Sequence, residues 1–137
     1  MVPSIRVVAA ALFDAEQRVL IAERPAGRHM QGRWEFPGGK VAAGESDAAA
    51  LARELKEELG IELLAGRFLL ALKHRYADRH VELSLWIVER YQGEPRGLDG
   101  QRLKWVPPAA LGAEDILEAD RPFIEALQRR DGQAAPG

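Results

Sequence analysis

The chain has 137 residues, of which 47% are hydrophobic and 29% charged, and this composition predicts one globular domain with a modest core. Its net charge of −2 provides no basic surplus for binding a nucleic-acid backbone, so we expect no nucleic-acid partner. The absence of cysteine excludes a disulfide framework, a zinc–thiolate site and a thiol nucleophile, and it is compatible with a reducing cytoplasm.

The first apolar run, residues 7–13, ends at Asp14 and is shorter than the ~20 residues that a membrane helix requires. It also lacks the small-residue cleavage site of a signal peptide. We therefore predict a buried strand over residues 5–13, no membrane segment and a cytoplasmic location.

Further strands are expected where apolar residues form short runs or alternate with polar ones. They are residues 19–23, 34–36, part of 61–72, 81–90 and 102–106. The segment 14–18 reads as a hairpin loop, and Pro37-Gly38-Gly39 as a sharp bend after a short strand.

Two helices are predicted from their end signals. Ser46 is a good N-cap and Gly60 a good C-cap, which places a helix over residues 47–59. Asp120 can cap a final helix that ends near residue 130, and residues 109–111 can form one helical turn. Strands mixed with two separate helices predict an α+β or α/β sandwich, with a single domain over residues 1–131 and a flexible tail over 132–137.

The helix at 47–59 carries two stripes. An apolar stripe, expected to pack on the sheet, is formed by Ala48, Leu51, Ala52, Leu55 and Leu59. Glu54, Glu57 and Glu58 form the neighbouring stripe, where their spacing brings three carboxylates together. Their mutual repulsion, and the unfavourable helix dipole near its C-terminus, is reversed by a hard cation such as Mg²⁺. A solvated acidic face paired with Arg53 and Lys56 is the alternative.

The residues upstream of this helix favour the metal-site interpretation. Gly38 and Gly39 permit close backbone approach and leave carbonyl groups free to coordinate a metal, although alone they are an ordinary tight turn. Glu45 can accept hydrogen bonds from backbone N–H groups or pair with Arg53.

The run Gly39-x5-Glu45-x7-Arg53-Glu54-Leu55-x-Glu57-Glu58-x-Gly60-Ile61 fills every defined position of the Nudix box, so the chain resembles the Nudix hydrolase family. The resemblance implies an α+β fold, the α/β/α sandwich in which a mixed β-sheet lies between helices. It also implies Mg²⁺- or Mn²⁺-dependent hydrolysis of a nucleoside diphosphate linked to another group.

Similarity to the MutT-like members of the family extends over nearly the whole chain. It is carried by Glu35-Phe36-Pro37-Gly38-Gly39-Lys40, by Asp78-Arg79-His80, by Glu89-Arg90-Tyr91-x-Gly93-Glu94-Pro95, and by Gly100-Gln101 followed by Trp105; Glu23-Arg24 and His29-Met30 also fit.

The resemblance implies that Glu54, Glu57 and Glu58, with the Gly38 carbonyl, hold the metal ion, and that Glu54 is also a candidate general base. It implies that Arg53 and Glu45 orient the box as an ion pair. A further catalytic and metal-binding carboxylate, a Glu in the family, is replaced here by Asp99, which is either a metal ligand with a shorter reach or a solvated loop residue.

Eight residues are expected to contact the nucleotide, and they are Arg24, His29, Glu35, Phe36, Lys40, Asp78, Arg79 and Asp120. Arg24 and Lys40 are candidate phosphate ligands, with plain surface cations as the alternative. Phe36 and His29 either line the base pocket or only pack, and Arg79 either contacts the base or is a surface charge.

Asp120 stands where MutT-like enzymes carry the Asn that reads an oxidised purine. An ionised Asp only accepts hydrogen bonds, whereas a protonated Asp can also donate one to O6 of 8-oxoguanine. A carboxylate also suits the exocyclic amine of cytosine. A simple helix N-cap that contacts no ligand remains the third interpretation.

The leading hypothesis is a nucleotide-pool sanitation enzyme that serves DNA replication and repair, hydrolysing an oxidised nucleoside triphosphate such as 8-oxo-dGTP to the monophosphate and pyrophosphate. A CTP or modified-cytosine nucleotide pyrophosphohydrolase is the runner-up, and an ADP-ribose-type hydrolase is disfavoured by the short chain. An inactive nucleotide-sensing module is disfavoured because all three box glutamates remain. We expect a monomer or weak homodimer whose partner is a nucleoside triphosphate, with no membrane contact.

Overall fold

The computed structural model describes residues 3–27 and 30–134. The chain divides into two compact units, each described by itself below. Unit 1 consists of Met1–Leu12 and Pro37–Leu98, and unit 2 of Phe13–Phe36 and Asp99–Gly137.

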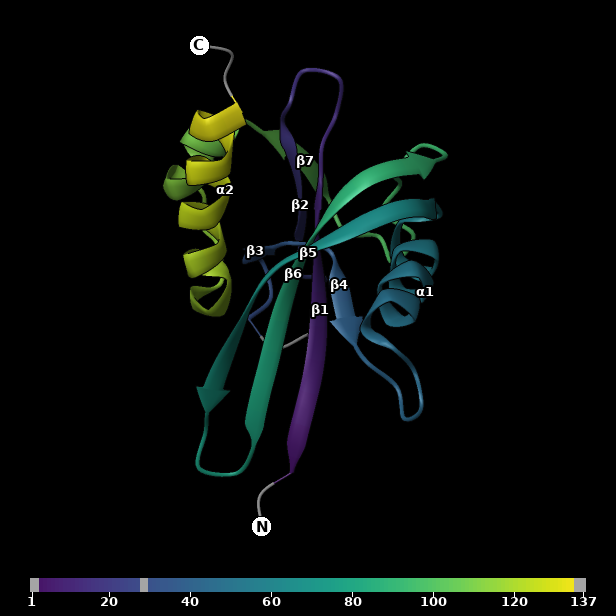
Figure 1. Cartoon of the computed structure of the whole chain (residues 1–137), viewed down its shortest axis with the longest axis vertical. Coiled ribbons are helices and arrows are strands. Elements are labelled where there is room, and N and C mark those ends of the chain that lie inside the picture. Colours follow the sequence, from purple (N-terminus) through teal and green to yellow (C-terminus); the bar gives the residue numbers. More distant parts are fainter. Residues whose placement is uncertain (1–2, 28–29, 135–137) are drawn as a thin grey trace. The chain divides into compact units, whose positions relative to one another are not determined.

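Unit 1 contains a mixed sheet with the strand order β4-β1-β6-β5 and one α-helix (Figure 1). Its elements are β1 (Ser4–Leu12), β4 (Gly38–Lys40), α1 (Asp47–Leu59), β5 (Glu62–Arg75) and β6 (His80–Gln92). Strand β1 is parallel to β6 and antiparallel to β4, and β5 is antiparallel to β6. A mixed sheet was expected from the family resemblance, and the structure confirms it.

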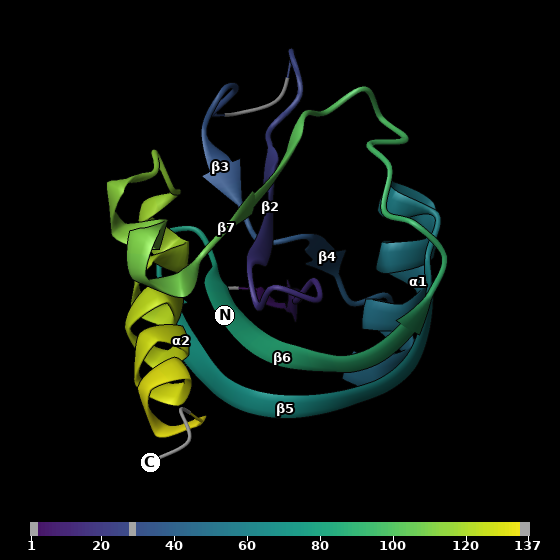
Figure 2. The same ribbon diagram turned by 90° about the horizontal axis from the view of Figure 1, so that it is seen from above.

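Strands β5 and β6 are longer than their apolar patterns predicted, because polar residues beside the turn between them also pair and because β6 continues to Gln92, opposite Glu62. The register shifts at three places, between Leu63 and Ala65, between Ala65 and Gly66, and between Phe68 and Leu70. Such bulges bend a strand and increase its twist. Figure 2 shows the result, since both strands curve and β5 begins beside α1.

Helix α1 has the bounds that its end signals predicted. The Ser46 side chain accepts a hydrogen bond from the Ala49 amide at 3.1 Å, and Gly60 adopts the left-handed conformation at φ 71°. Leu51, Leu55 and Leu59 are fully buried as expected, and each such burial stabilises the fold by about 1.5–3 kcal/mol.

The prediction for Ala48 is wrong, since it is exposed and Ala50 is buried instead. The buried stripe is therefore rotated at the N-terminal end of α1. Helix α1 contacts β1, β4 and β5.

Unit 2 contains an antiparallel sheet in the order β3-β2-β7 and three helical segments. Its elements are β2 (Val19–Glu23), β3 (Trp34–Glu35), β7 (Leu103–Val106), the 3₁₀ helices η1 (Pro108–Ala113) and η2 (Glu118–Asp120), and α2 (Arg121–Ala134). Helix α2 contacts both 3₁₀ helices. Among the described residues, no helix combines the length and apolarity needed to cross a membrane.

Three local predictions differ from the structure. Residues 14–18 form the expected tight loop, in which Asp14 accepts from the Arg18 amide at 2.8 Å, but pairing across it stops at the Phe13–Val19 bridge and β2 joins a different sheet from β1. The Gly38-Gly39 bend is itself strand β4. Helix α2 continues to Ala134 instead of ending near residue 130.

Candidate active site

Strand β4 places the backbone of two glycines, Gly38 and Gly39, directly beside the glutamate face of the helix. A Cβ atom at Gly38 would overlap the carbonyl oxygen of Val8 on the neighbouring strand, and one at Gly39 would lie 2.6 Å from Glu54 Oε1. No residue with a side chain fits either position without movement of its neighbours. Glycine is therefore needed at both positions, because β1 at Val8 and the carboxylate of Glu54 approach the backbone of β4 so closely.

Arg53 is the organising residue of this region. Its Nε donates to Glu45 Oε2 at 2.8 Å and its second terminal nitrogen to Glu45 Oε1 at 2.9 Å, which is the bidentate geometry that guanidinium and carboxylate favour. The same nitrogen also donates to the Lys40 carbonyl at 2.9 Å. Arg53 thus joins the helix to strand β4 and to the loop that precedes the helix.

The remaining terminal nitrogen of Arg53 faces two glutamates of its own helix. It donates to Glu54 Oε1 at 2.9 Å and to Glu57 Oε2 at 3.3 Å. The two carboxylates therefore converge on one donor, which offsets their repulsion. The predicted ion pair of Arg53 with Glu45 is present. Arg53 also pairs with the acidic face of the helix, which was the alternative to a metal site.

These hydrogen bonds shift the titration of both partners. Hydrogen bonds from Arg53, and next the Ala42 amide at 2.9 Å, lower the pKa of Glu45 to about 2. Hydrogen bonds to Glu45 and then to Glu54 raise the pKa of Arg53 above its usual value. The pair is consequently charged over the whole physiological range.

The three box glutamates have different surroundings. The Glu54 side chain is 15% exposed and lies against Gly39, whereas the Glu57 side chain is 60% exposed. Glu58 is half-buried and accepts a hydrogen bond from the Gly38 amide at 3.3 Å. The Gly38 peptide and the helix face are therefore adjacent, as the metal-site interpretation requires.

The donor types of this cluster fit a hard divalent cation, since carboxylate oxygens and backbone carbonyls are the ligands that Mg²⁺ favours. Among the residues that the structure describes, however, no three Asp, Glu or His side chains converge as a ready-made metal cluster. Each of the three carboxylates has a hydrogen-bond partner, since Arg53 donates to Glu54 and Glu57 and the Gly38 amide donates to Glu58.

Unit 2 gathers a second set of predicted residues. One terminal nitrogen of Arg24 donates to both oxygens of Glu35 at 3.0 Å. The next residue, Phe36, donates its backbone N–H to Asp120 Oδ2 at 3.1 Å and packs against Phe123 with ring centroids 6.3 Å apart. Phe36 is 3% exposed, so its ring is a packing residue within this unit.

Asp120 is one of two buried polar residues in the described part of the chain, at 6% exposure. Burial raises its pKa to about 7, the Phe36 amide opposes this shift, and the neighbouring charges of Glu35 and Arg24 act in opposite directions. The carboxyl therefore gains and loses its proton near neutrality. Its side chain accepts a hydrogen bond from the Phe36 amide across the unit, a contact that the helix-cap interpretation did not predict.

The other predicted residues are more exposed. The Lys40 and Asp99 side chains face solvent, and the Asp99 amide donates to Gln101 Oε1 at 2.9 Å. Arg79 lies 3.9 Å from Asp78 and its guanidinium lies over the Tyr76 ring at 5.3 Å. His29 lies outside the described residues.

Two residues near Arg79 were not singled out from the sequence. Tyr76 lies between Arg79 and His74, whose ring stacks on it at 6.3 Å. The Nε2 atom of His74 is buried and has no hydrogen-bond partner among the described residues. The sequence pattern predicted a strand only up to residue 72, whereas β5 continues to Arg75. The pattern therefore gave no reason to single out His74 or Tyr76.

The chain was compared with known proteins. The NUDIX domain family matches residues 3–127. The 8-oxo-dGTP diphosphatase of Escherichia coli K12 is 36% identical over 125 residues, covering 91% of this chain and 97% of the relative. The CTP pyrophosphohydrolase of the same organism is 37% identical over 120 residues, covering 88% and 89%. The solution structure of the E. coli ORF135 protein matches with a TM-score of 0.86 at 35% identity, covering 98% and 96%, and the α+β class is thereby confirmed.

Proposed function

Because the chain belongs to the Nudix family, we propose that this hydrolase is a nucleoside triphosphate pyrophosphohydrolase that depends on Mg²⁺, with Mn²⁺ as a substitute. It converts an oxidised or otherwise non-standard nucleotide to the monophosphate and pyrophosphate, in the cytoplasm, as a nucleotide-pool enzyme. The observation that carries this proposal is the Arg53 network, in which one guanidinium binds Glu45, Glu54, Glu57 and the carbonyl of Lys40, next to Gly38 and Gly39 in strand β4.

We assign the metal to Glu54, Glu57, Glu58 and the Gly38 carbonyl, with Asp99 as an additional candidate. A bound Mg²⁺ would neutralise phosphate charge and polarise the phosphorus that water attacks. Arg53 and Glu45 hold the glutamate face of α1 and strand β4 in fixed relative positions. Since the Arg53–Glu45 pair stays ionised throughout the physiological pH range, this support does not change with pH.

The chemical step itself is a hydrolysis. The oxygen of water bonds to one of the two phosphorus atoms that share the α–β bridging oxygen, and the bond from that phosphorus to the bridging oxygen breaks. The proton of the water goes to Glu54, whose carboxylate can accept it, and the products are the monophosphate and pyrophosphate. No covalent enzyme intermediate is required, which agrees with the absence of cysteine.

For the nucleotide we propose contacts from Arg24 and Lys40 to phosphate oxygens. Glu35 orients Arg24 because both of its carboxylate oxygens accept hydrogen bonds from one guanidinium nitrogen. His29, Asp78 and Arg79 complete the proposed nucleotide-contacting set.

The raised pKa of Asp120 favours a second candidate substrate. With a pKa near 7, its carboxyl is present in both forms at neutral pH. The ionised form accepts from the exocyclic amine of a cytosine nucleotide, and the protonated form can donate to O6 of 8-oxoguanine. Support for both candidates also comes from the relatives, one named 8-oxo-dGTP diphosphatase and the other CTP pyrophosphohydrolase.

A substrate panel separates these candidates. Pyrophosphate or phosphate release is measured with Mg²⁺ for 8-oxo-dGTP, dGTP, CTP, 5-methyl-dCTP and ADP-ribose. Preference for 8-oxo-dGTP over dGTP supports the first candidate and preference for a cytosine nucleotide supports the second. A strong preference for ADP-ribose contradicts both.

The metal assignment is tested by Glu57→Gln, which removes a charge but keeps the shape of the side chain. We expect at least about 100-fold lower kcat/KM. The matched control is Glu62→Gln, an exposed glutamate at the start of β5, which we expect to keep full activity. If the wild-type protein shows no Mg²⁺-dependent release of any product, the chain is a nucleotide-binding module and the proposal fails.

A further inference from the structure

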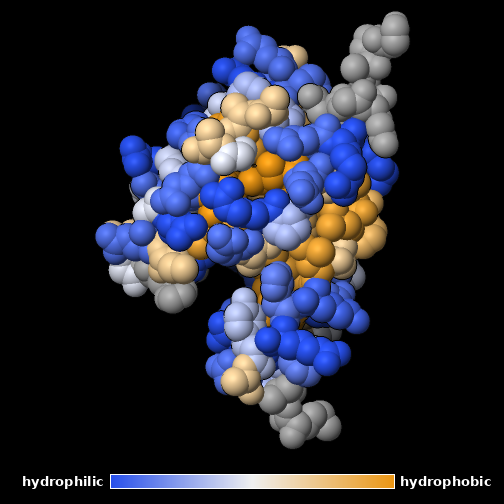
Figure 3. All heavy atoms as spheres, turned by 90° about the vertical axis from the view of Figure 1, so that its left-hand side faces the viewer, coloured by the Kyte–Doolittle hydropathy of each residue, from blue (hydrophilic) through white to orange (hydrophobic). Residues whose placement is uncertain are grey.

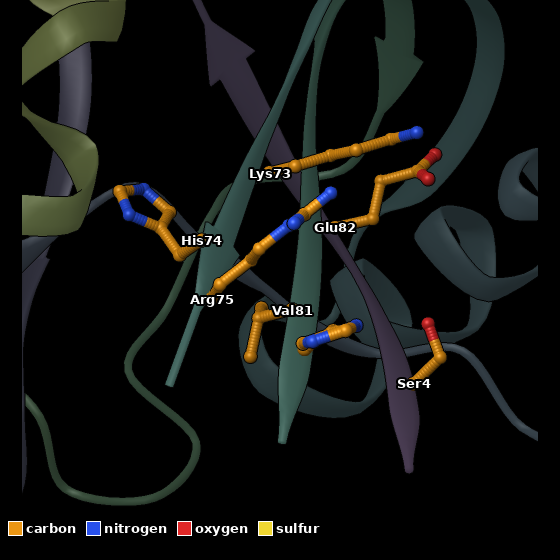
Figure 4. Close-up of a pocket in the computed structure, with 7 residues that line it drawn as sticks. Ser4, Lys73, His74, Arg75, Val81 and Glu82 are labelled. Atoms are coloured by element: carbon orange, nitrogen blue, oxygen red, sulfur yellow. The ribbon is translucent and has the colours of Figure 1, made fainter. Parts of the chain in front are cut away.

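A cavity of about 170 Å³ lies on the sheet of unit 1, where β1, β5 and β6 run next to one another beside the β5–β6 turn (Figure 4). Its polar lining comes from three strands and consists of Ser4, Lys73, His74, Arg75, His80 and Glu82. The volume is that of roughly six liquid waters at ~30 Å³ each. This is the size of a small anion and is too small for a whole nucleotide.

Strand register brings these side chains together. Arg75 is paired with His80 across β5 and β6, and His80 is paired with Ser4 across β6 and β1. One pair further along, Lys73 stands opposite Glu82. Directly paired residues in neighbouring strands have their Cβ atoms about 5 Å apart, so the side chains form two adjacent rows on one face of the sheet.

The two cations point to the same side of β5. Figure 4 shows Lys73 and Arg75 extending together on the side of Glu82, while His74, between them in sequence, points the opposite way. This follows from the alternation of side chains along a strand. Figure 3 shows the end of unit 1 near the N-terminus as mainly hydrophilic.

The lining of this cavity carries a net positive charge, because the two cations Lys73 and Arg75 outnumber the one carboxylate, Glu82, which stands opposite Lys73. Within the part of the chain that the structure describes, neither Lys73 nor Arg75 forms a salt bridge or a side-chain hydrogen bond. Arg6, on the neighbouring strand β1, is different, since it donates to Asp47 at 2.8 Å and to the Glu45 carbonyl at 3.1 Å. Glu82 offsets one of the two positive charges in the cavity, and an oxyanion beside Arg75 offsets the other.

We propose that this cavity, the β5–β6 basic pocket (Ser4, Lys73, Arg75 and His80), binds a phosphate-type oxyanion. The Arg75 guanidinium supplies a planar pair of donors and Lys73 a mobile ammonium group. Ser4 and His80 add a hydroxyl and an imidazole donor. The pocket consists of residues outside the glutamate cluster, so it does not depend on the proposed hydrolysis.

The test is a titration of the ¹⁵N-labelled protein with sodium orthophosphate and, separately, sodium pyrophosphate, followed by NMR. EDTA is present throughout, so that phosphate cannot bind through a metal at the glutamate cluster. We expect saturable shifts of the Ser4, Lys73–Arg75 and His80–Glu82 signals with a Kd of about 1 mM or below. Tighter binding of pyrophosphate identifies the diphosphate as the ligand, and equal or tighter binding of orthophosphate identifies the single phosphate.

Two variants separate the pocket from general electrostatic attraction. Lys73→Gln and Arg75→Gln should each weaken binding by about tenfold, because a charge-assisted hydrogen bond is lost. Arg90→Gln, which removes an exposed cation from β6 outside the pocket, should leave the Kd unchanged. Circular dichroism and thermal unfolding establish that each variant is folded.

The proposal is overturned if shifts rise linearly without saturation, if sodium chloride at equal ionic strength produces the same shifts, or if Arg90→Gln weakens binding as much as Arg75→Gln does. Since activity is not measured, failure of this proposal and failure of the proposed hydrolysis are distinguishable.

Discussion

Replacing Asp120 with Asn changes one buried ionisable group while keeping its shape. Asp120 is 6% exposed and accepts the Phe36 amide hydrogen bond at 3.1 Å. The amide oxygen of Asn can accept the same hydrogen bond, so the variant loses mainly the capacity to ionise. Burial raises the pKa of Asp120 from 3.8 to about 7, and this difference sets the size of the effect.

Each pKa unit corresponds to about 1.4 kcal/mol, so ionising Asp120 in the folded protein costs on the order of 4 kcal/mol. Below pH 3.8 the carboxyl is protonated in both folded and unfolded chains and costs nothing. As the pH rises from 3.8 to 7 the unfolded chain ionises while the folded chain keeps its proton, so stability falls. Above pH 7 Asp120 is ionised in both the folded and the unfolded chain, and the loss of stability stays constant.

Urea unfolding of wild type and Asp120→Asn at pH 4.5 and pH 8 measures this effect. We expect the variant to be more stable relative to wild type at pH 8 than at pH 4.5, by a few kcal/mol, or on the order of 10 °C in Tm. Asp78→Asn, at a side chain that is 76% exposed, is the control and should show no such change. If the stability difference between Asp120→Asn and wild type is the same at both pH values, the burial argument is refuted.

Three further substitutions probe the region around α1. Gly39→Ala should displace the Glu54 carboxylate and lower kcat by about tenfold or more in a pyrophosphate-release assay, because the new Cβ occupies the position that Glu54 Oε1 approaches. Glu45→Gln removes the bidentate partner of Arg53; wild type should be the more stable of the two above pH 4.5 and lose that advantage as the pH falls toward 2, which acid unfolding of both proteins measures. Ser46→Ala should cost about 1 kcal/mol in urea unfolding with kcat unchanged, since only the α1 cap is lost; a large fall in kcat would contradict a purely capping role.

Local structure was predictable wherever it depends on residues that lie close together in the sequence. Helix α1 begins and ends where Ser46 and Gly60 indicated, because the cap hydrogen bonds join residues only a few positions apart. The ion pair of Arg53 with Glu45 was anticipated as well, since both lie in the box motif. The family followed from the same motif, and its match over residues 3–127 bears that out.

Pairing between distant strands was less predictable. The Gly38-Gly39 segment read as a bend, but it is strand β4 because β1 offers it a backbone partner. The loop at residues 14–18 suggested that β1 and β2 pair, whereas β1 pairs with β6 and β2 with β7. Hydrophobic pattern identifies a strand, but it does not identify the neighbour that satisfies its hydrogen bonds.

By itself the sequence determined the helix with its glutamate face, the ion pair of Arg53 with Glu45 and the family. Those features arise from contacts between near neighbours, which any local stretch of chain encodes. Tertiary structure alone decided that Asp120 meets the amide of Phe36, 84 positions earlier, and that Lys73, Arg75 and His80 share one cavity with Ser4. The physical reason is that burial and cross-strand register depend on how remote segments pack, and packing determines which side chains lose water and which keep it.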